Sequence, residues 1–257
     1  MMNSLDFWTI PPAEFPRLTD GTVHIWLFSI KNVEPLIAKL QEILQKEERE
    51  KIDNYRVESA KQSFILSRGI VRLLLSRYIK VKPENILIVY NHNSKPEIDR
   101  SINNNSVSFN LSHSGNAILI GFAMKRRIGV DIERIHPLKK VDEIAQYVFS
   151  AGEYEEFVKL PFSKKQKVFF SCWTRKEAVI KALGLSIGET FDQFSVPLTS
   201  GRTGERITLE KYPDKNVTLF LSDLYGLGEY RAAYCIENGP VECTGFKGEA
   251  DYLVKIV

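Results

Sequence analysis

Residues 128–133 read Ile-Gly-Val-Asp-Ile-Glu, and this short run predicts a strand with two different faces. Side chains alternate across a strand, so the three branched aliphatic residues are expected to face a core while Gly129, Asp131 and Glu133 share the opposite face. Two carboxylates this close repel each other, and a divalent cation between them is the commonest answer. The stretch therefore predicts a metal site, against the alternative of a half-buried strand whose polar face is only wet.

Composition limits the class of protein and of partner. The 257 residues suffice for one large domain or two of modest size. Lys and Arg total 35 against 32 Asp and Glu, and a net charge of +3 is too small to indicate nucleic acid by itself. The three cysteines show neither metal-site spacing nor a disulfide framework, and we see no signal peptide and no membrane span. We expect a cytoplasmic protein without a membrane or nucleic-acid partner.

The order of the expected elements is typical of two similar α+β lobes that meet near residues 124–128. Each half runs from a strand through helices to further strands, and sites often lie between lobes. Strands are predicted at 23–30, 86–90, 107–111, 117–124, 128–133, 206–209, 217–221 and 230–236, and helices at 34–51, 59–79, 141–149, 151–158 and 164–183.

The helix predicted at the end of the last group carries charges beside its apolar stripe. Lys176 falls inside the stripe, while Glu177 and Lys181 lie one turn apart on its flank. A charge directed toward a core needs a partner, so Lys176 needs an anion that this helix does not supply. The alternative is that Lys176 reaches water and that Glu177–Lys181 is an ordinary exposed pair.

The first half of the chain has a similar feature. Arg68 falls among apolar residues of the 59–79 helix, and a guanidinium there invites a phosphate unless it extends to water. A second signal is Phe-Asn-Leu-Ser-His-Ser-Gly at 109–115, where a strand delivers Ser112 and His113 into a turn that can hold an anion. A lone histidine is more often structural than chemical.

Three motifs in order resemble one family: Phe-Asn-Leu-Ser-His-Ser at 109–114, Ile-Gly-Val-Asp-Ile-Glu at 128–133 and Trp-Thr-Arg-Lys-Glu-Ala at 173–178. They resemble the phosphopantetheinyl transferases of the surfactin-synthetase-activating type. Ser67-Arg68 and Ser-Lys-Pro at 94–96 also look like that family, so the resemblance covers most of residues 45–196. The chain departs from the family at Ser94, where a glycine often precedes Lys-Pro, and at Gly184-Leu-Ser186, which replaces a more Gly-rich turn.

The resemblance implies an enzyme that moves 4′-phosphopantetheine from coenzyme A to a serine of an acyl or peptidyl carrier protein and releases adenosine 3′,5′-bisphosphate. It implies a monomer, a pseudo-dimer of two α+β lobes divided into residues 1–125 and 126–257, with the active site in the cleft between them. Implied metal ligands for Mg²⁺, or Mn²⁺, are Asp131, Glu133 and Glu177. Implied coenzyme contacts are Lys51 and Arg68 at the 3′-phosphate, Lys95 and Pro96 at the adenine, and Ser112, His113, Lys176 and Lys181 around the phosphates. Implied catalytic residues are Glu177, Lys181 and a general base, Glu153.

Three alternatives stay open at this point. The motif around Glu153 fits a glutamate stabilised at a helix N-terminus as well as it fits a base. The chain could be an inactive module that binds coenzyme A or a carrier protein. Clustered carboxylates and lysines also suit a Mg²⁺-dependent phosphodiesterase, although the small net charge speaks against a nuclease.

Overall fold

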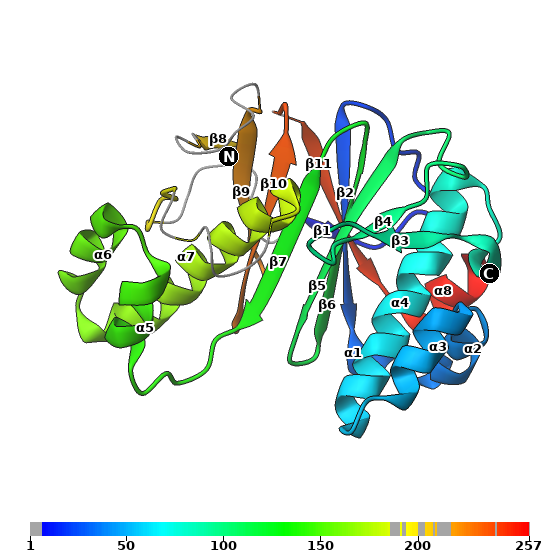
Figure 1. Ribbon diagram of the computed structural model, residues 1–257, viewed down its shortest axis with the longest axis horizontal. Helices are drawn as coiled ribbons and strands as arrows, with labels where there is room; N and C mark the ends of the chain where they lie inside the picture. Colours follow the sequence, from blue (N-terminus) through cyan, green and yellow to red (C-terminus); the bar gives the residue numbers. More distant parts are fainter. Residues whose placement is uncertain are drawn as a thin grey trace.

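The structure is a computed structural model, and it describes residues 7–185, 191, 194–199, 204–207, 209, 217–239 and 241–256. Figure 1 shows two lobes side by side, each with a sheet and a long helix of 22 residues packed against it. The predicted α+β class and two-lobe architecture are confirmed. Over the described part of the chain, no helix is both long enough and apolar enough to cross a bilayer.

The first lobe is built on a five-stranded sheet with the strand order β1-β11-β2-β6-β5. Strands β2, β6 and β5 are antiparallel neighbours, whereas β11 runs parallel to both β1 and β2. A separate hairpin, β3–β4, lies outside this sheet. The strands are β1 (Trp8–Thr9), β2 (Thr22–Ser29), β3 (Ile88–Tyr90), β4 (Pro96–Ile98), β5 (Val107–Ser114), β6 (Ala117–Met124) and β11 (Glu242–Gly248).

Short helices precede the long helix of this lobe. The single helix predicted at 34–51 is wrong, because Pro35 lies in a 3-10 turn that begins at Glu34 and Gln45 caps a new helix with a capping box. The helical segments of the lobe are α1 (Ile30–Val33), η1 (Glu34–Leu36), α2 (Ile37–Glu42), α3 (Lys46–Asp53), α4 (Glu58–Ile79), η2 (Pro83–Asn85) and α8 (Ala250–Ile256).

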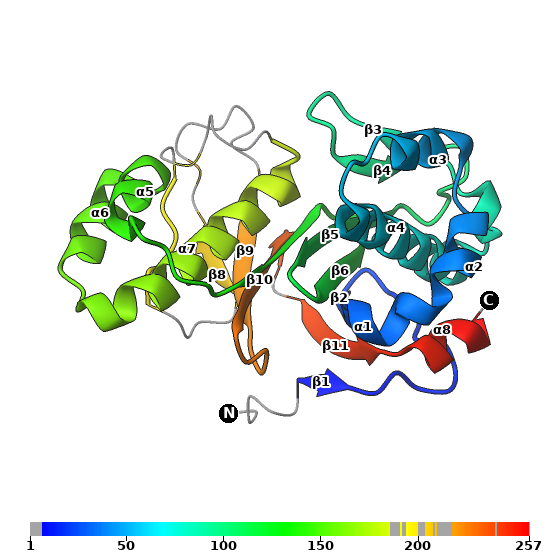
Figure 2. The same ribbon diagram turned by 90° about the horizontal axis from the view of Figure 1, so that it is seen from below.

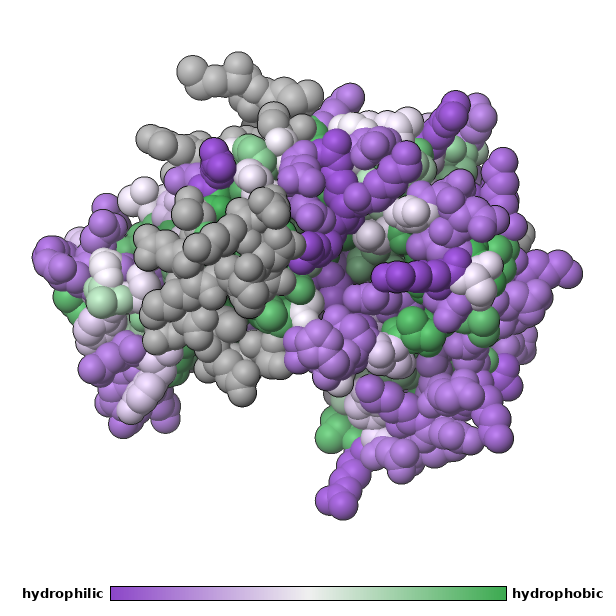
Figure 3. Space-filling view, turned by 45° about the horizontal axis from the view of Figure 1, so that its top comes forward, coloured by the Kyte–Doolittle hydropathy of each residue, from purple (hydrophilic) through white to green (hydrophobic). Residues whose placement is uncertain are grey.

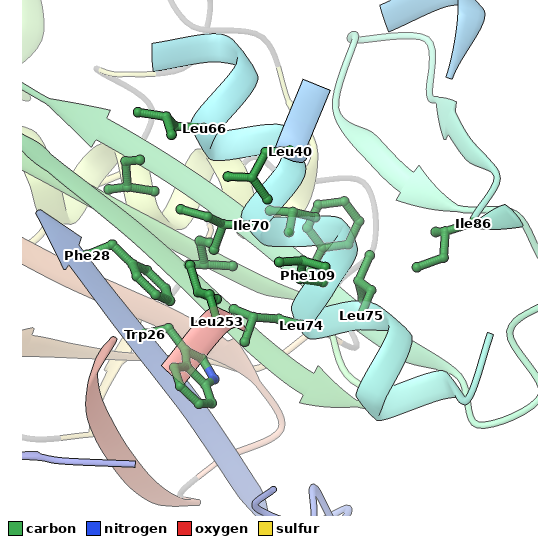
Figure 4. Close-up of a cluster of buried hydrophobic side chains, with 14 of the residues drawn as sticks. Trp26, Phe28, Leu40, Leu66, Ile70, Leu74, Leu75, Ile86, Phe109 and Leu253 are labelled. Atoms are coloured by element: carbon green, nitrogen blue, oxygen red, sulfur yellow. The ribbon is translucent and has the colours of Figure 1, made fainter. Parts of the chain in front are cut away.

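The C-terminal segment returns to the first lobe. Strand β11 pairs with β2, and Leu253 of α8 is fully buried in the same core as Trp26 and Leu74 (Figure 4). The predicted division at residue 125 is therefore wrong for residues 242–256. The physical reason is that β2 would otherwise present an unpaired edge over an apolar core. Figure 2 shows β1 lying outside β11 at the far edge of this sheet.

The second lobe has a four-stranded sheet with the order β7-β10-β9-β8. Helix α7 packs on this sheet, and α5 and α6 lie at the end of the lobe away from the first lobe (Figures 1 and 2). The elements are β7 (Ile128–Arg134), α5 (Val141–Val148), α6 (Ala151–Val158), α7 (Phe162–Leu183), β8 (Glu205–Ile207), β9 (Leu219–Leu224) and β10 (Tyr230–Glu237). Part of the strand predicted at 206–209 lies outside the described residues.

A third apolar core joins the two sheets. It contains Val23 and Ile25 from β2 and the three aliphatic residues of β7, all fully buried. The predicted inward face of β7 is confirmed, and the core that it faces is the boundary between the lobes. Gly121 of β6 makes the close approach possible, since a Cβ there would lie 2.6 Å from Cγ1 of Val130.

The outer surface is largely polar. In the view of Figure 3, hydrophobic residues appear only in scattered positions among hydrophilic ones over the described part of the chain. The buried apolar side chains form three cores, while a few large apolar residues, such as Ile10, Tyr147 and Phe162, are exposed. The fold thus places β5 of the first lobe beside β7 of the second, with α7 covering β7.

Candidate active site

Strands β5 and β7 are joined by side chains from alternate residues of β5. Asn110 Oδ1 accepts a hydrogen bond from the Val130 amide at 2.8 Å. Ser112 Oγ donates to Asp131 Oδ1 at 2.7 Å, and the next residue on that face, Ser114, donates to Glu133 Oε2 at 2.7 Å. The two serines orient the two carboxylates of the 128–133 motif across the lobe boundary.

Helix α7 supplies the other half of the site, and Gly129 sets its distance from β7. A Cβ on Gly129 would lie 2.0 Å from the Ala178 carbonyl oxygen and 2.3 Å from the Ala182 amide nitrogen. The helix backbone therefore occupies the room beside Gly129, and the Asp131 face of the strand is covered rather than wet. This contact brings Lys181 within 2.6 Å of Asp131 Oδ1 and 3.2 Å of Ser112 Oγ.

The three predicted metal ligands share one electrostatic environment. Burial and the charges of Asp131 and Glu133 raise the pKa of Glu177 to about 7, although Lys181 opposes the shift. Burial also raises the pKa of Glu133, against its hydrogen bond from Ser114. Lys181 is held charged, because Asp131 and Glu177 raise its pKa despite burial. The site concentrates negative charge around a single lysine.

Two buried carboxylate oxygens at this point, Asp131 Oδ2 and Glu177 Oε2, have no hydrogen-bond partner. Among the described residues, no group of three His, Cys, Asp or Glu side chains is close enough together to hold a metal ion. Lys181 and Ser112 both contact Asp131 Oδ1, which leaves Oδ2 as the unpartnered oxygen of that carboxylate. The unpartnered oxygens from β7 and α7 are nevertheless the hard oxygen donors that Mg²⁺ prefers, so these residues fit the predicted cation.

Cations of the first lobe lie near the acidic group. Arg68 is buried with Nη1 unpartnered, and its guanidinium lies 5.6 Å from the Phe64 ring and 5.7 Å from the Tyr90 ring. The Lys51 ammonium lies 5.5 Å from the same Phe64 ring. Desolvation of its imidazole, together with the charges of Lys181 and Arg68, lowers the pKa of His113. The structure thus brings cations from both lobes toward one place.

Lys95 and Pro96 also lie at the lobe boundary. Pro96 pairs with Tyr90 in the β3–β4 hairpin. The Lys95 ammonium reaches the second lobe, 3.3 Å from the Ile128 carbonyl oxygen and 3.4 Å from that of Ala182.

Comparisons with family models and curated relatives identify the family of this chain. Residues 127–235 match the model described as 4′-phosphopantetheinyl transferase superfamily, and residues 33–124 match 4′-phosphopantetheinyl transferase, N-terminal. The chain is 31% identical over 215 residues to the 4′-phosphopantetheinyl transferase HetI of Nostoc sp., covering 81% of this chain and 90% of the relative. The chain belongs to the 4′-phosphopantetheinyl transferase superfamily. It is also 30% identical over 169 residues to the 4′-phosphopantetheinyl transferase psf-1 of Bacillus pumilus, covering 66% of this chain and 70% of the relative.

The predicted enzyme class is confirmed by these matches: the protein is a transferase of the phosphopantetheinyl type. The two family models end and begin between residues 124 and 127, at the turn that leads from β6 into β7. The acidic motif thus opens the second matched region, and the Phe109–Ser114 motif lies near the end of the first.

Two residues implied for the chemistry of the transferase have another place in the structure. Lys176 is fully buried, and its ammonium lies 2.8 Å from Glu153 Oε2 and donates to the Phe194 carbonyl at 2.8 Å. Glu153 is 4% exposed and accepts from the amides of Ser150 and Val196 at 2.7 and 2.6 Å. Glu153, predicted as the general base, and Lys176, predicted as a phosphate ligand, therefore form a structural ion pair with each other instead. The anion that the sequence required for Lys176 is Glu153.

The sequence analysis did not select Asn110 and Ser114 of the candidate site, although both stand in the quoted motif. Their spacing could have identified them, because residues 110, 112 and 114 lie on the same face of a strand. The glycine that the family often has at the position of Ser94 has a structural reason. The Ser94 φ of 62° is a left-handed conformation, which explains why a glycine suits this turn.

Proposed function

We propose that this transferase moves the 4′-phosphopantetheine moiety of coenzyme A to a serine of an acyl or peptidyl carrier protein, with Mg²⁺ as the preferred cation and Mn²⁺ as a substitute. The serine oxygen bonds to the phosphorus that carries the pantetheine arm, and its proton passes to water. The bond from that phosphorus to the bridging diphosphate oxygen breaks, and adenosine 3′,5′-bisphosphate leaves. The cytoplasmic location, the monomeric state and the absence of membrane and nucleic-acid partners also stay predictions.

One observation carries the proposal: unpartnered carboxylate oxygens of Asp131 and Glu177 lie beside Lys181, with His113 and Arg68 on the first-lobe side. A diphosphate is an anion of the size and charge that such a mixed site can hold when a divalent cation is present. The cation would neutralise charge that builds on the leaving diphosphate. Two buried acids without a cation would instead repel this substrate.

The residues of the chain divide the remaining work. Lys181 faces the acids and donates to phosphate oxygens that develop charge during transfer. His113 reaches the same phosphates from β5. Arg68, whose Nη1 is buried without a partner, and Lys51 hold the 3′-phosphate on the first lobe, and the backbone of Lys95 and Pro96 borders the adenine. Positioning and charge neutralisation supply most of the acceleration, as in phosphoryl transfer generally.

The test is the intact mass of an apo-carrier protein after incubation with the protein, coenzyme A and Mg²⁺. We expect a gain of about 340 Da, the mass of the phosphopantetheine arm, that is lost with EDTA and in Asp131→Ala. Asp53→Ala, which removes an exposed carboxylate of α3, is the matched control and should leave the mass gain intact. Binding of coenzyme A without transfer to any carrier class would instead support an inactive binding module. Hydrolysis of phosphodiesters would support the other alternative.

A further inference from the structure

The loop of the β3–β4 hairpin contacts the C-terminal end of α7 across the lobe boundary (Figure 2). Asn93 Nδ2 donates to the Gly184 carbonyl at 2.7 Å, and a Cβ on Gly184 would lie 2.9 Å from Asn91 Nδ2. Gly184 adopts a φ of 68° where α7 ends, so the helix terminates directly against the loop.

Hydrogen bonds within the loop fix its conformation, in addition to its contact with the helix. Asn91 Oδ1 accepts from the amides of Asn93 and Lys95 at 2.9 and 3.0 Å, and the Asn91 amide donates to the Lys95 carbonyl at 3.0 Å. Ser94 completes the turn with its positive φ. The side chain of Lys95 therefore extends from a turn of fixed conformation.

The Lys95 ammonium contacts both elements that carry the acidic site. One contact is the Ile128 carbonyl at the start of β7, three residues before Asp131, and the other is the Ala182 carbonyl, one residue after Lys181. The last carbonyls of a helix lack intrahelical donors, and a cation there is favoured by the helix dipole. Burial lowers the pKa of Lys95 to about 8, which agrees with an ammonium enclosed at this boundary.

We infer that Lys95 is a positioning residue of the transfer reaction, which holds the end of α7 against β7 and so fixes Lys181 relative to Asp131. Asn93 supports it at Gly184. Lys95 acts through these two backbone carbonyls, not through contact of its ammonium with the nucleotide. Because misplacement of a catalytic group by about 1 Å can cost a hundredfold in rate, its loss lowers turnover more than it weakens coenzyme binding.

The inference is tested by the steady-state kinetics of transfer by Lys95→Met. This kinetic test rests on the proposed function. We expect kcat to fall at least tenfold while KM for coenzyme A changes less than threefold. Lys95→Arg keeps a cation at the carbonyls and should recover most of kcat. Lys39→Met removes an exposed lysine of α2 and should match the wild type. A raised KM with unchanged kcat would identify Lys95 as a direct nucleotide ligand and overturn the inference.

Hydrogen exchange gives a second measurement that needs no activity. In Lys95→Met and in Asn93→Ala, amides at 180–185 and 128–130 should exchange faster than in the wild type, while amides of α4 keep their protection and report an intact fold. Unchanged exchange at the end of α7 would overturn the inference even if transfer were impaired. If the wild type transfers nothing to any carrier, the proposed function fails, but the exchange result still decides whether Lys95 holds the helix.

Discussion

Single residues of the acidic site carry a cost in stability, and their proposed role as metal ligands accounts for their presence. Glu177 is buried with Oε2 unpartnered, and the neighbouring Asp131 and Glu133 help to raise its pKa to about 7. Ionised buried carboxylates that lack a partner destabilise the fold. Residues of this kind are retained in a chain when their chemistry requires them, so replacement should separate activity from stability.

Glu177→Gln should therefore lose transfer activity without losing stability. We expect turnover to fall at least a hundredfold, because one oxygen donor for the cation is replaced by an amide. At pH 8 without divalent cations, the free energy of unfolding should stay equal or rise by up to about 2 kcal/mol, since one buried negative charge is removed. Urea denaturation and carrier loading measure the two effects.

Glu155→Gln is the matched control for that change, since Glu155 is an exposed glutamate whose ion pair with Lys159 lies at the surface. It should alter neither quantity measurably. Turnover by Glu177→Gln comparable to that of the wild type would exclude Glu177 as a ligand. A large loss of stability would show that the ionised carboxylate is needed for folding.

The low pKa of His24 predicts how the free energy of unfolding depends on pH. This β2 residue is 5% exposed with Nδ1 2.8 Å from the Tyr78 hydroxyl oxygen, and burial lowers its pKa to about 4 from 6.5. Well above pH 6.5 the histidine is neutral in both the folded and the unfolded state. At lower pH His24 binds a proton in the unfolded state but not in the folded state, so the free energy of unfolding falls as the pH drops toward 4.

Between pH 7.5 and 5, His24 should account for about 2 kcal/mol of lost stability. The free energy of unfolding of His24→Gln should depend less steeply on pH by that amount, whatever its stability at pH 7.5. Equal slopes for variant and wild type would mean that the pKa of His24 is the same in the folded and unfolded states.

At the scale of elements, the site depends on how closely α7 packs on β7. Gly129→Ala would force a Cβ into the backbone of α7 at Ala178 and Ala182, where no side chain can rotate away. We expect a loss of roughly 3 kcal/mol or more and at least a tenfold loss of transfer, because the helix must shift. Gly152→Ala in α6 has no atom within 4 Å of the new Cβ. That control should be neutral or gain up to about 1 kcal/mol.

Elements with strong periodicity could be predicted from the sequence, and elements that depend on distant partners could not. The alternation in β7 and the apolar stripe of α7 gave both the confirmed lobe architecture and the positions of Asp131, Glu177 and Lys181. Strand β11 was not predicted, because its place between β1 and β2 follows from pairing across more than 200 residues.

The wrong roles of Glu153 and Lys176 have a similar origin. Periodicity showed that Lys176 points into a core, and this is confirmed. It could not show which anion meets it, since Glu153 belongs to another helix, α6. The local sequence pattern thus predicted that the Lys176 charge is buried, whereas its partner depends on tertiary packing.

At the scale of the whole molecule, the two lobes share structure and should unfold together. The chain leaves the first lobe at β7 and returns to it at β11, and an apolar core contains residues of both sheets. The Trp8 indole of β1 also donates to the Tyr225 carbonyl of the second lobe at 2.6 Å. Unfolding of either lobe would therefore expose part of the other.

We expect one cooperative transition, which tryptophan fluorescence can test because Trp26 lies in the first-lobe core and Trp173 on α7. Variants that retain only one of these, with Phe at the other two tryptophan positions, should give urea transitions whose midpoints match the circular dichroism of the same variant. Coenzyme A should raise both midpoints equally, since binding to either lobe stabilises the shared folded state. Separate fluorescence midpoints, or a shift of Trp26 alone on adding coenzyme A, would mean that the lobes unfold independently. In that case the contacts of β11 and Trp8 would contribute little to holding the acidic site of β7 against the cations of the first lobe.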